Sequence, residues 1–144
     1  MNWRFWGSKD TPGKAPKPPK PYWITRIRRD VLELIFASAR SQHPNEFGAM
    51  LRAEKGVITE LLVIPGTISG ATHAIFQMHM LPIDFTVKGT VHSHPSPNAS
   101  PSQADKELFT RFGSTHIIVA QPYNEHTWRA YNARGEPIAL TIVD

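Results

Sequence analysis

Hydrophobic residues near the start of the chain recur at the spacing of a helix. The helix predicted over residues 27–42 carries on one side Ile27, Val31, Leu34, Ile35 and Ser38. Pro44 cannot continue a helix, and the residue before a proline is biased away from helical backbone. We therefore expect this helix to end near Gln42.

Further along, short apolar runs bounded by Pro, Gly and Asn are typical of strands. Strands are predicted over residues 47–51, 57–64, 86–94, 116–120, 128–132 and 138–143. A second helix is predicted over residues 102–112, with Ser102 as its N-cap. Residues 66–80 show no regular pattern, and residues 81–85 are expected to be extended. The pattern predicts a mixed α/β domain whose β-sheet is wrapped on at least two helices.

Composition limits the kinds of site that the chain can build. Its 144 residues fit one domain, and a hydrophobic content of 40% is typical of a globular protein. Cysteine is absent, so any metal ligand must come from His, Asp, Glu or water. The sequence shows no signal peptide and no apolar run long enough to span a membrane. We expect a cytoplasmic protein without a membrane partner.

The basic charge of the chain belongs to its first residues. Residues 1–21 contain five basic side chains and one acidic one, whereas residues 22–144 contain eleven of each. The Pro- and Lys-rich segment 7–21 is expected to be a flexible or extended spacer, and the aromatic residues before it to be solvated or to form a docking tag. We place the folded domain at residues 22–144. Nucleic-acid binding is not expected, because a basic face on the domain is missing.

Two histidines and an aspartate form a possible metal site. His92 and His94 lie two residues apart in a predicted strand, so their side chains point to the same face. Asp105 follows at the edge of the inward side of the second helix, where a carboxylate needs a partner. Two imidazoles and one carboxylate are the three-ligand set of a catalytic zinc site that keeps its fourth position for water.

Each part of this pattern also has a simpler interpretation. A His-x-His pair alone is a weak indication of metal binding. The step from Ser102 to Asp105 is the pattern of a capping box at a helix start, and Ser102 can cap the helix and also act in catalysis. His43, His73, His79, His116 and His126 lack paired spacing and are expected to be surface or core residues.

Metal-assisted hydrolysis also requires a group that moves the proton of the attacking water. Glu46 is our candidate for this general acid and base. It follows the end of the first helix and precedes a predicted strand with the small or apolar residues Phe47, Gly48 and Ala49. The alternative is that Glu46 is an ordinary turn residue on the surface.

Together these residues resemble the signature of the JAMM (MPN+) metallopeptidase family. That signature is a Glu, then His-x-His-Pro, then ten residues to an Asp that has a Ser three residues before it. The matching positions are Glu46, His92, His94, Pro95, Ser102 and Asp105. The resemblance covers residues 25–144 and is greatest to short archaeal members. Many members have Gly three residues after the Glu, whereas Gly48 lies two residues after Glu46.

The resemblance implies a cytidine-deaminase-like MPN fold and one Zn²⁺ per chain held by His92, His94 and Asp105. It further implies that Glu46 is the general acid and base and that Ser102 donates to the oxyanion. The expected reaction is hydrolysis of isopeptide bonds at the C-terminus of ubiquitin-like modifier proteins, with these modifiers and their conjugates as partners and a homodimer possible. The alternatives are a non-catalytic scaffold module of the same fold, or a peptidase that trims a sulfur-carrier protein.

Overall fold

The computed structural model describes residues 23–63 and 86–144. The predicted spacer, the irregular segment 66–80 and the extended segment 81–85 lie outside the described residues. The described elements are β1 (Arg26–Arg28), α2 (Arg29–Gln42), β2 (Gly48–Glu54), β3 (Val57–Val63), β4 (Gly89–His94), α4 (Gln103–Phe109), β5 (Thr115–Ala120), β6 (Trp128–Tyr131), β7 (Pro137–Ile138) and β8 (Thr141–Val143).

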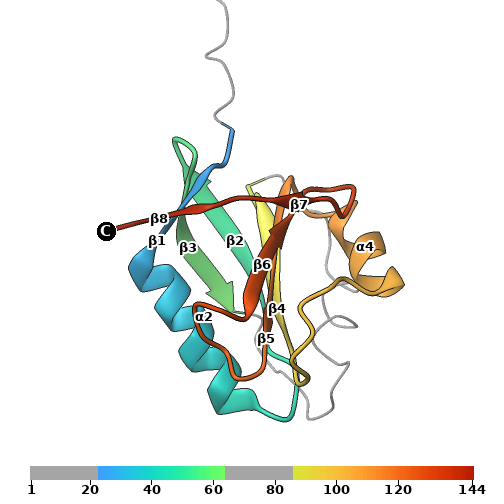
Figure 1. Ribbon diagram of the computed structural model, residues 1–144. Helices are drawn as coiled ribbons and strands as arrows, with labels where there is room; N and C mark the ends of the chain where they lie inside the picture. Colours follow the sequence, from blue (N-terminus) through green and yellow to red (C-terminus); the bar gives the residue numbers. More distant parts are fainter. Residues whose placement is uncertain (1–22, 64–85) are drawn as a thin grey trace, which may run out of the picture.

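All of these strands belong to one mixed sheet (Figure 1). Their order is β7-β6-β5-β4-β2-β3-β1-β8. β4 lies in the middle of the sheet, parallel to β5 and antiparallel to β2. A central strand is covered on both faces and has no free edge, which makes it a rigid base for side chains that must hold a fixed geometry.

The two helices cover different faces of the sheet. The core on the α2 side includes Ile35, Val91 and Ile117. On the other side, Phe109 of α4 packs with Ile118. Because successive side chains of a strand point to opposite faces, the residues beside Val91 in β4 face the α4 side. The predicted fold class, a mixed sheet wrapped on two helices, is confirmed.

The first helix ends at Gln42, as predicted. Its predicted start and part of its predicted apolar side are wrong. Ile27 belongs to β1, where it pairs with β3 and β8, and α2 begins at Arg29. Leu34 is 52% exposed, and Ser38 is only partly buried. The buried side of the helix consists of Val31, Leu32, Ile35, Phe36 and Ala39.

Other predicted elements need smaller corrections. The strand predicted over residues 86–94 begins at Gly89, and the second helix ends at Phe109 rather than at residue 112. The strand predicted over residues 138–143 is two strands: β7 pairs with β6, and β8 pairs with β1 at the opposite edge of the sheet. Leu140 lies between them, where the chain crosses the end of the sheet.

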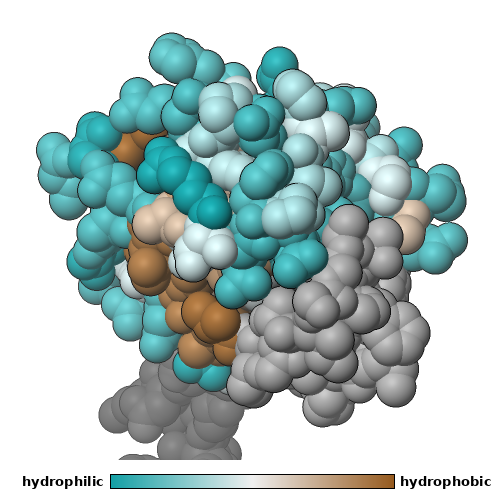
Figure 2. Space-filling model, turned by 90° about the horizontal axis from the view of Figure 1, so that it is seen from below, coloured by the Kyte–Doolittle hydropathy of each residue, from teal (hydrophilic) through white to brown (hydrophobic). Residues whose placement is uncertain are grey.

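The surface seen along the strands is largely hydrophilic, with a smaller group of hydrophobic residues among the teal ones (Figure 2). In the part of the chain that is described, the exposed large hydrophobic residues are Trp23, Leu34 and Val63. Neither described helix is long and apolar enough to cross a membrane.

Candidate metal centre

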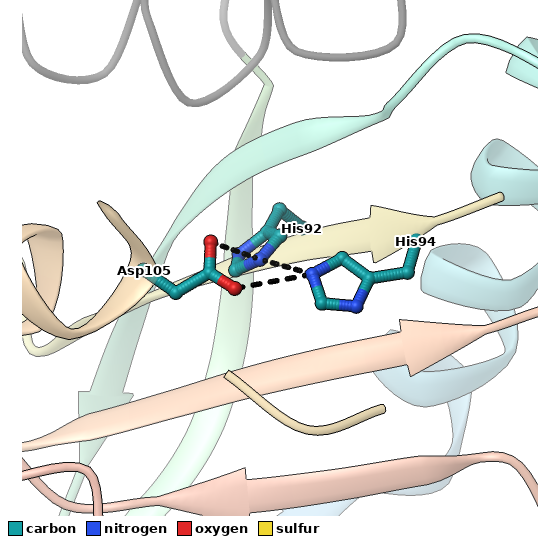
Figure 3. A group of neighbouring side chains, drawn as sticks. All are labelled: His92, His94 and Asp105. Carbon is teal, nitrogen blue, oxygen red and sulfur yellow. Dashed lines mark hydrogen bonds and ion pairs between the residues drawn. The ribbon is translucent and has the colours of Figure 1, made fainter. Parts of the chain in front are cut away.

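The two histidines of β4 meet at the end of the strand (Figure 3). Their Nε2 atoms are 3.2 Å apart. His92 is fully buried, whereas the side chain of His94 is 15% exposed. The predicted same-face geometry is therefore present, and only the outer ring is open to solvent.

Asp105 lies in the first turn of α4, directly opposite the two imidazoles. Its Oδ1 is 3.0 Å from Nε2 of His92, and its Oδ2 is 3.1 Å from Nε2 of His94. The capping box is also present, since the Ser102 hydroxyl accepts from the Asp105 N–H and Asp105 Oδ2 accepts from the Ser102 N–H. The capping interpretation is thus correct, and it leaves Oδ1 of Asp105 available to a ligand.

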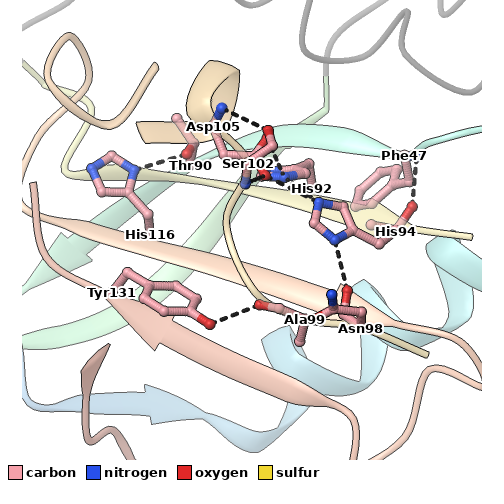
Figure 4. A network of polar contacts seen from close by, with 11 residues as sticks. Phe47, Thr90, His92, His94, Asn98, Ala99, Ser102, Asp105, His116 and Tyr131 are labelled. Carbon is pink, nitrogen blue, oxygen red and sulfur yellow. Dashed lines mark hydrogen bonds and ion pairs between the residues drawn. The ribbon is translucent and has the colours of Figure 1, made fainter. Parts of the chain in front are cut away.

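A hydrogen bond to the backbone fixes the orientation of His94 (Figure 4). Its Nδ1–H donates to the carbonyl oxygen of Asn98 over 2.8 Å. In the neutral ring, Nε2 therefore carries the lone pair that a metal requires. The next residue along, Ala99, accepts a 2.7 Å bond from the buried hydroxyl of Tyr131. No local sequence pattern connects Asn98 or Tyr131 with the site.

The three side chains fit a metal ion. Ligands about 2.0–2.2 Å from a tetrahedral zinc ion lie roughly 3.3 Å from one another. The distances among the Nε2 atoms and the carboxylate oxygens are 3.0 to 3.2 Å. Apart from its 3.0 Å contact with Nε2 of His92, the buried Oδ1 of Asp105 has no hydrogen-bond partner among the described residues. Among residues 23–63 and 86–144, only His92, His94 and Asp105 form a group that could hold a metal ion.

Glu46 lies on the same face of the sheet as the histidines. Gly48 pairs with His92 as the last pair of the ladder between β2 and β4, and Phe47 before it packs in the core on the α2 side. Glu46 therefore points to the opposite side, where the charges of His94 and Asp105 act on it. Glu46 is 7% exposed, and its Oε2 has no hydrogen-bond partner in the described part of the chain. It is therefore not a surface turn residue. Burial, offset in part by the charge of His94, raises the pKa of Glu46 to about 7.

Ser102 is exposed beside the buried carboxylate of Asp105. Its oxygen uses one lone pair to accept from the Asp105 N–H over 3.1 Å. The hydroxyl hydrogen is not used in that bond, because a hydroxyl donates and accepts through different positions. Ser102 can therefore cap α4 and donate a hydrogen bond toward solvent at the same time.

Charge in the site is shared between the carboxylate and the rings. Burial alone raises the pKa of Asp105, but hydrogen bonds from His92 and His94 outweigh it and hold that pKa far below its usual range. For His94, burial lowers the pKa, and the bonds to Asp105 and Asn98 reverse the effect and raise it. Without a metal ion, the His94 ring is therefore stabilised in its charged form by the ionised Asp105.

The other described histidines lie away from this group, as expected. His116 is buried and stacks on Phe109; its Nε2–H donates to Gly113, and its Nδ1 contacts the Thr90 hydroxyl. His43 and His126 are exposed. His73 and His79 lie outside the described residues.

Sequence comparison identifies relatives of the chain. Residues 28–132 match the family model of prokaryotic homologs of the JAB domain. A probable metalloprotease from Haloferax volcanii is 34% identical over 131 residues, which cover 84% of this chain and 81% of that protein.

Solved structures agree with this assignment. One, described as JAMM, a metalloprotease-like zinc site in the proteasome and signalosome, has a TM-score of 0.67 and 41% identity, covering 84% of this chain and 99% of that one. A JAB1/MPN domain protein from Archaeoglobus fulgidus has a TM-score of 0.67 and 44% identity, covering 83% of this chain and 100% of that one. The family match and the fold agree, and the chain belongs to the JAMM (MPN+) family, among the prokaryotic homologs of the JAB domain.

Proposed function

We propose that this protein is a zinc-dependent isopeptidase that releases ubiquitin-like modifier proteins by hydrolysing the bond at their C-terminus. The observation that carries the proposal is the convergence of His92, His94 and Asp105 within 3.2 Å of one another, with a buried carboxylate, Glu46, on the same face of the sheet. Family membership supports the reaction class, since the Haloferax volcanii relative is a probable metalloprotease.

Zinc is the metal that we propose for this donor set. Two imidazole nitrogens and one carboxylate oxygen leave a tetrahedral zinc ion with one position for water. A solved relative is described as having a metalloprotease-like zinc site. When bound, zinc supplies Lewis acidity to the scissile carbonyl and lowers the pKa of water.

Glu46 is the proposed proton carrier. Its carboxylate accepts the proton of the attacking water and then delivers it to the nitrogen of the leaving amine. A pKa of about 7, caused chiefly by burial, suits a group that must accept and release a proton near neutral pH. Its position near His94 and Asp105 supports this role, because a base must reach the water from the side of the metal ligands.

Ser102 is the proposed hydrogen-bond donor to the carbonyl oxygen as that oxygen becomes negative. Its hydroxyl is held at the start of α4 by the Asp105 N–H and is exposed to a substrate. A donor that is already positioned stabilises the developing charge at little cost in reorganisation.

The proposed substrate is the extended C-terminal tail of a ubiquitin-like protein joined to a lysine amine. Among the described residues of the site, His92 and Asp105 are buried, whereas His94 and Ser102 reach the surface, so we expect a substrate to enter from the side of these two residues. A solved relative's description, which places its zinc site in the proteasome and signalosome, supports a substrate connected with modifier conjugation.

A cleavage assay with zinc-loaded protein tests this proposal. The substrates are an isopeptide conjugate of a ubiquitin-like modifier and a matched sulfur-carrier protein with a C-terminal extension. We expect release of free modifier from the conjugate, loss of cleavage with a chelator, and no turnover by a Glu46→Gln variant that still binds zinc. Cleavage of the carrier alone would change the substrate class, and equal behaviour of the parent and variant in every assay would favour a scaffold module.

A further inference from the structure

Ser93 lies between the two histidines in sequence but on the other face of the sheet. Side chains alternate along β4, so Ser93 shares a face with Val91, which packs on the α2 side. Ser93 is fully buried. It therefore cannot reach a metal ion or a substrate on the face of the histidines.

The Ser93 hydroxyl instead holds the chain directly after Glu46. The N–H of Phe47 donates to Oγ of Ser93 over 2.8 Å, and the N–H of Ser93 donates to the carbonyl oxygen of Phe47 over 2.9 Å. The bond at Phe47 is marked beside His94 in Figure 4. Two hydrogen bonds thus join this residue of the Glu46 segment to the strand of the histidines.

This arrangement departs from a regular antiparallel pair. In such a pair, the Phe47 N–H donates to the main-chain carbonyl of Ser93. Here the side-chain hydroxyl takes the place of that carbonyl, so the regular ladder between β2 and β4 begins at Gly48. The Ser93 side chain therefore determines where the chain leaves the sheet, one residue after the buried carboxylate of Glu46.

A fixed backbone matters here because the Glu46 side chain has few constraints of its own. Its Oε2 has no hydrogen-bond partner within residues 23–63 and 86–144. The position of the carboxylate relative to His94 therefore depends on the backbone that carries it. A displacement of about 1 Å in a catalytic group can cost roughly 100-fold in rate.

We propose that Ser93 is a positioning residue, whose hydroxyl holds the Glu46 segment so that the carboxylate faces the metal-binding histidines. The proposal rests on the proposed function insofar as Glu46 is the proton carrier. It assigns to Ser93 no contact with substrate or metal, and it predicts that loss of the hydroxyl affects turnover more than metal binding.

The test compares three variants of the full chain. Ser93→Ala removes the hydroxyl, and Ser93→Thr restores an oxygen at the same place. Thr90→Val is the matched control: it removes another buried hydroxyl of β4, one that contacts His116 of the neighbouring strand β5. Zinc affinity, kcat, KM, the pH profile of kcat and hydrogen exchange of the Phe47 amide are measured for each.

We expect Ser93→Ala to lower kcat roughly 10- to 100-fold, to change the pH profile, and to leave KM and zinc affinity within about threefold. Its Phe47 amide should exchange faster, and Ser93→Thr should recover most of kcat and of the amide protection. Thr90→Val should lower stability without these changes. Equal kcat losses in Ser93→Ala and Thr90→Val, or a parallel loss of zinc affinity, would overturn the proposal.

Failure of the proposed function is distinguishable from failure of this inference. If the parent protein cleaves no conjugate, the proposed function fails, and the NMR signals of Phe47 and Glu46 still report on the contact. Unchanged exchange and unchanged Glu46 signals in Ser93→Ala would then show that the hydroxyl does not position this segment.

Discussion

The Oδ2 atom of Asp105 lies 3.1 Å from Nε2 of His94 while it also accepts a 2.8 Å hydrogen bond from the Ser102 N–H. One carboxylate thus serves the start of a helix and the candidate metal centre. The two roles have different requirements. A capping residue requires only a hydrogen-bond acceptor, whereas a metal ligand benefits from a full negative charge.

Asp105→Asn should separate these two roles. The asparagine oxygen can still accept from Ser102, so α4 should keep its cap, but the anionic ligand is lost. We expect zinc affinity to fall by at least about 100-fold. The unfolding free energy of the metal-free protein should also fall, because the buried contacts of the carboxylate with the two rings are weakened although the cap is kept. Isothermal titration with zinc and chemical denaturation measure the two effects. Unchanged zinc affinity would limit Asp105 to capping.

Ser102→Gly tests the hydroxyl separately from the cap. Glycine is a good N-cap residue and should cost only a few tenths of a kcal/mol in stability. Loss of the donor to the carbonyl oxygen should lower kcat roughly 100-fold or more. Steady-state kinetics and thermal unfolding of the zinc-loaded protein check both values. A kcat close to that of the parent would remove Ser102 from the proposed chemistry.

The raised pKa of Glu46 should appear in the stability of metal-free protein. Below its unfolded-state pKa near 4.5, Glu46 is protonated in both the folded and the unfolded protein. Between pH 4.5 and about 7 it ionises in the unfolded chain but stays protonated in the folded one, so stability falls as pH rises. Relative to Glu46→Gln, the parent should therefore lose about 3 kcal/mol between pH 4.5 and 8. Urea unfolding of both proteins measures the difference. A constant difference would contradict a buried Glu46 carboxyl.

His116 should make the opposite contribution at acidic pH. Burial lowers its pKa to about 4, so the unfolded chain binds a proton more readily than the folded one below pH 6.5. The parent should lose roughly 3 kcal/mol more than His116→Gln as pH falls from 7 to 4. Unfolding of metal-free proteins across this range checks the result. Equal slopes would show that His116 titrates like a solvated ring.

Tyr131→Phe tests whether the loop after β4 holds His94 in place. The change removes the 2.7 Å bond to Ala99 and leaves the ring that stacks near Phe109. We expect a loss of about 1–2 kcal/mol in stability and a several-fold weaker zinc affinity, because the neighbouring carbonyl of Asn98 orients His94. Zinc titration measures the effect, and unchanged affinity would limit Tyr131 to packing.

The metal-binding group could be predicted because its members are close in sequence. His92 and His94 need only the alternation of one strand, and Asp105 follows after a short loop and a helix cap. Glu46 was a candidate from its place between a helix and a strand and from the family signature, but its approach to the histidines depends on the pairing of β2 with β4. The contacts of Ser93 and Tyr131 depend on the same kind of distant pairing, which a local pattern does not contain.

The errors in the predicted elements have the same cause. Ile27 fits the helical spacing of the residues that follow, but parallel pairing with β3 and β8 places it in a strand. Residues 138–143 read as one strand, although their two ends pair at opposite edges of the sheet. Long-range pairing overrides local preference where the two disagree.

Because Asp105 both caps α4 and belongs to the candidate metal centre, metal binding and the stability of the first turn of α4 are coupled. Removal of the metal leaves the Asp105 carboxylate held by the Ser102 N–H and by its contacts with the two imidazole rings, so a change at the ligands also acts on the first turn of the helix. Heat resistance of this protein should therefore track the free zinc concentration around it, and starvation for zinc should act on its lifetime as well as on its turnover.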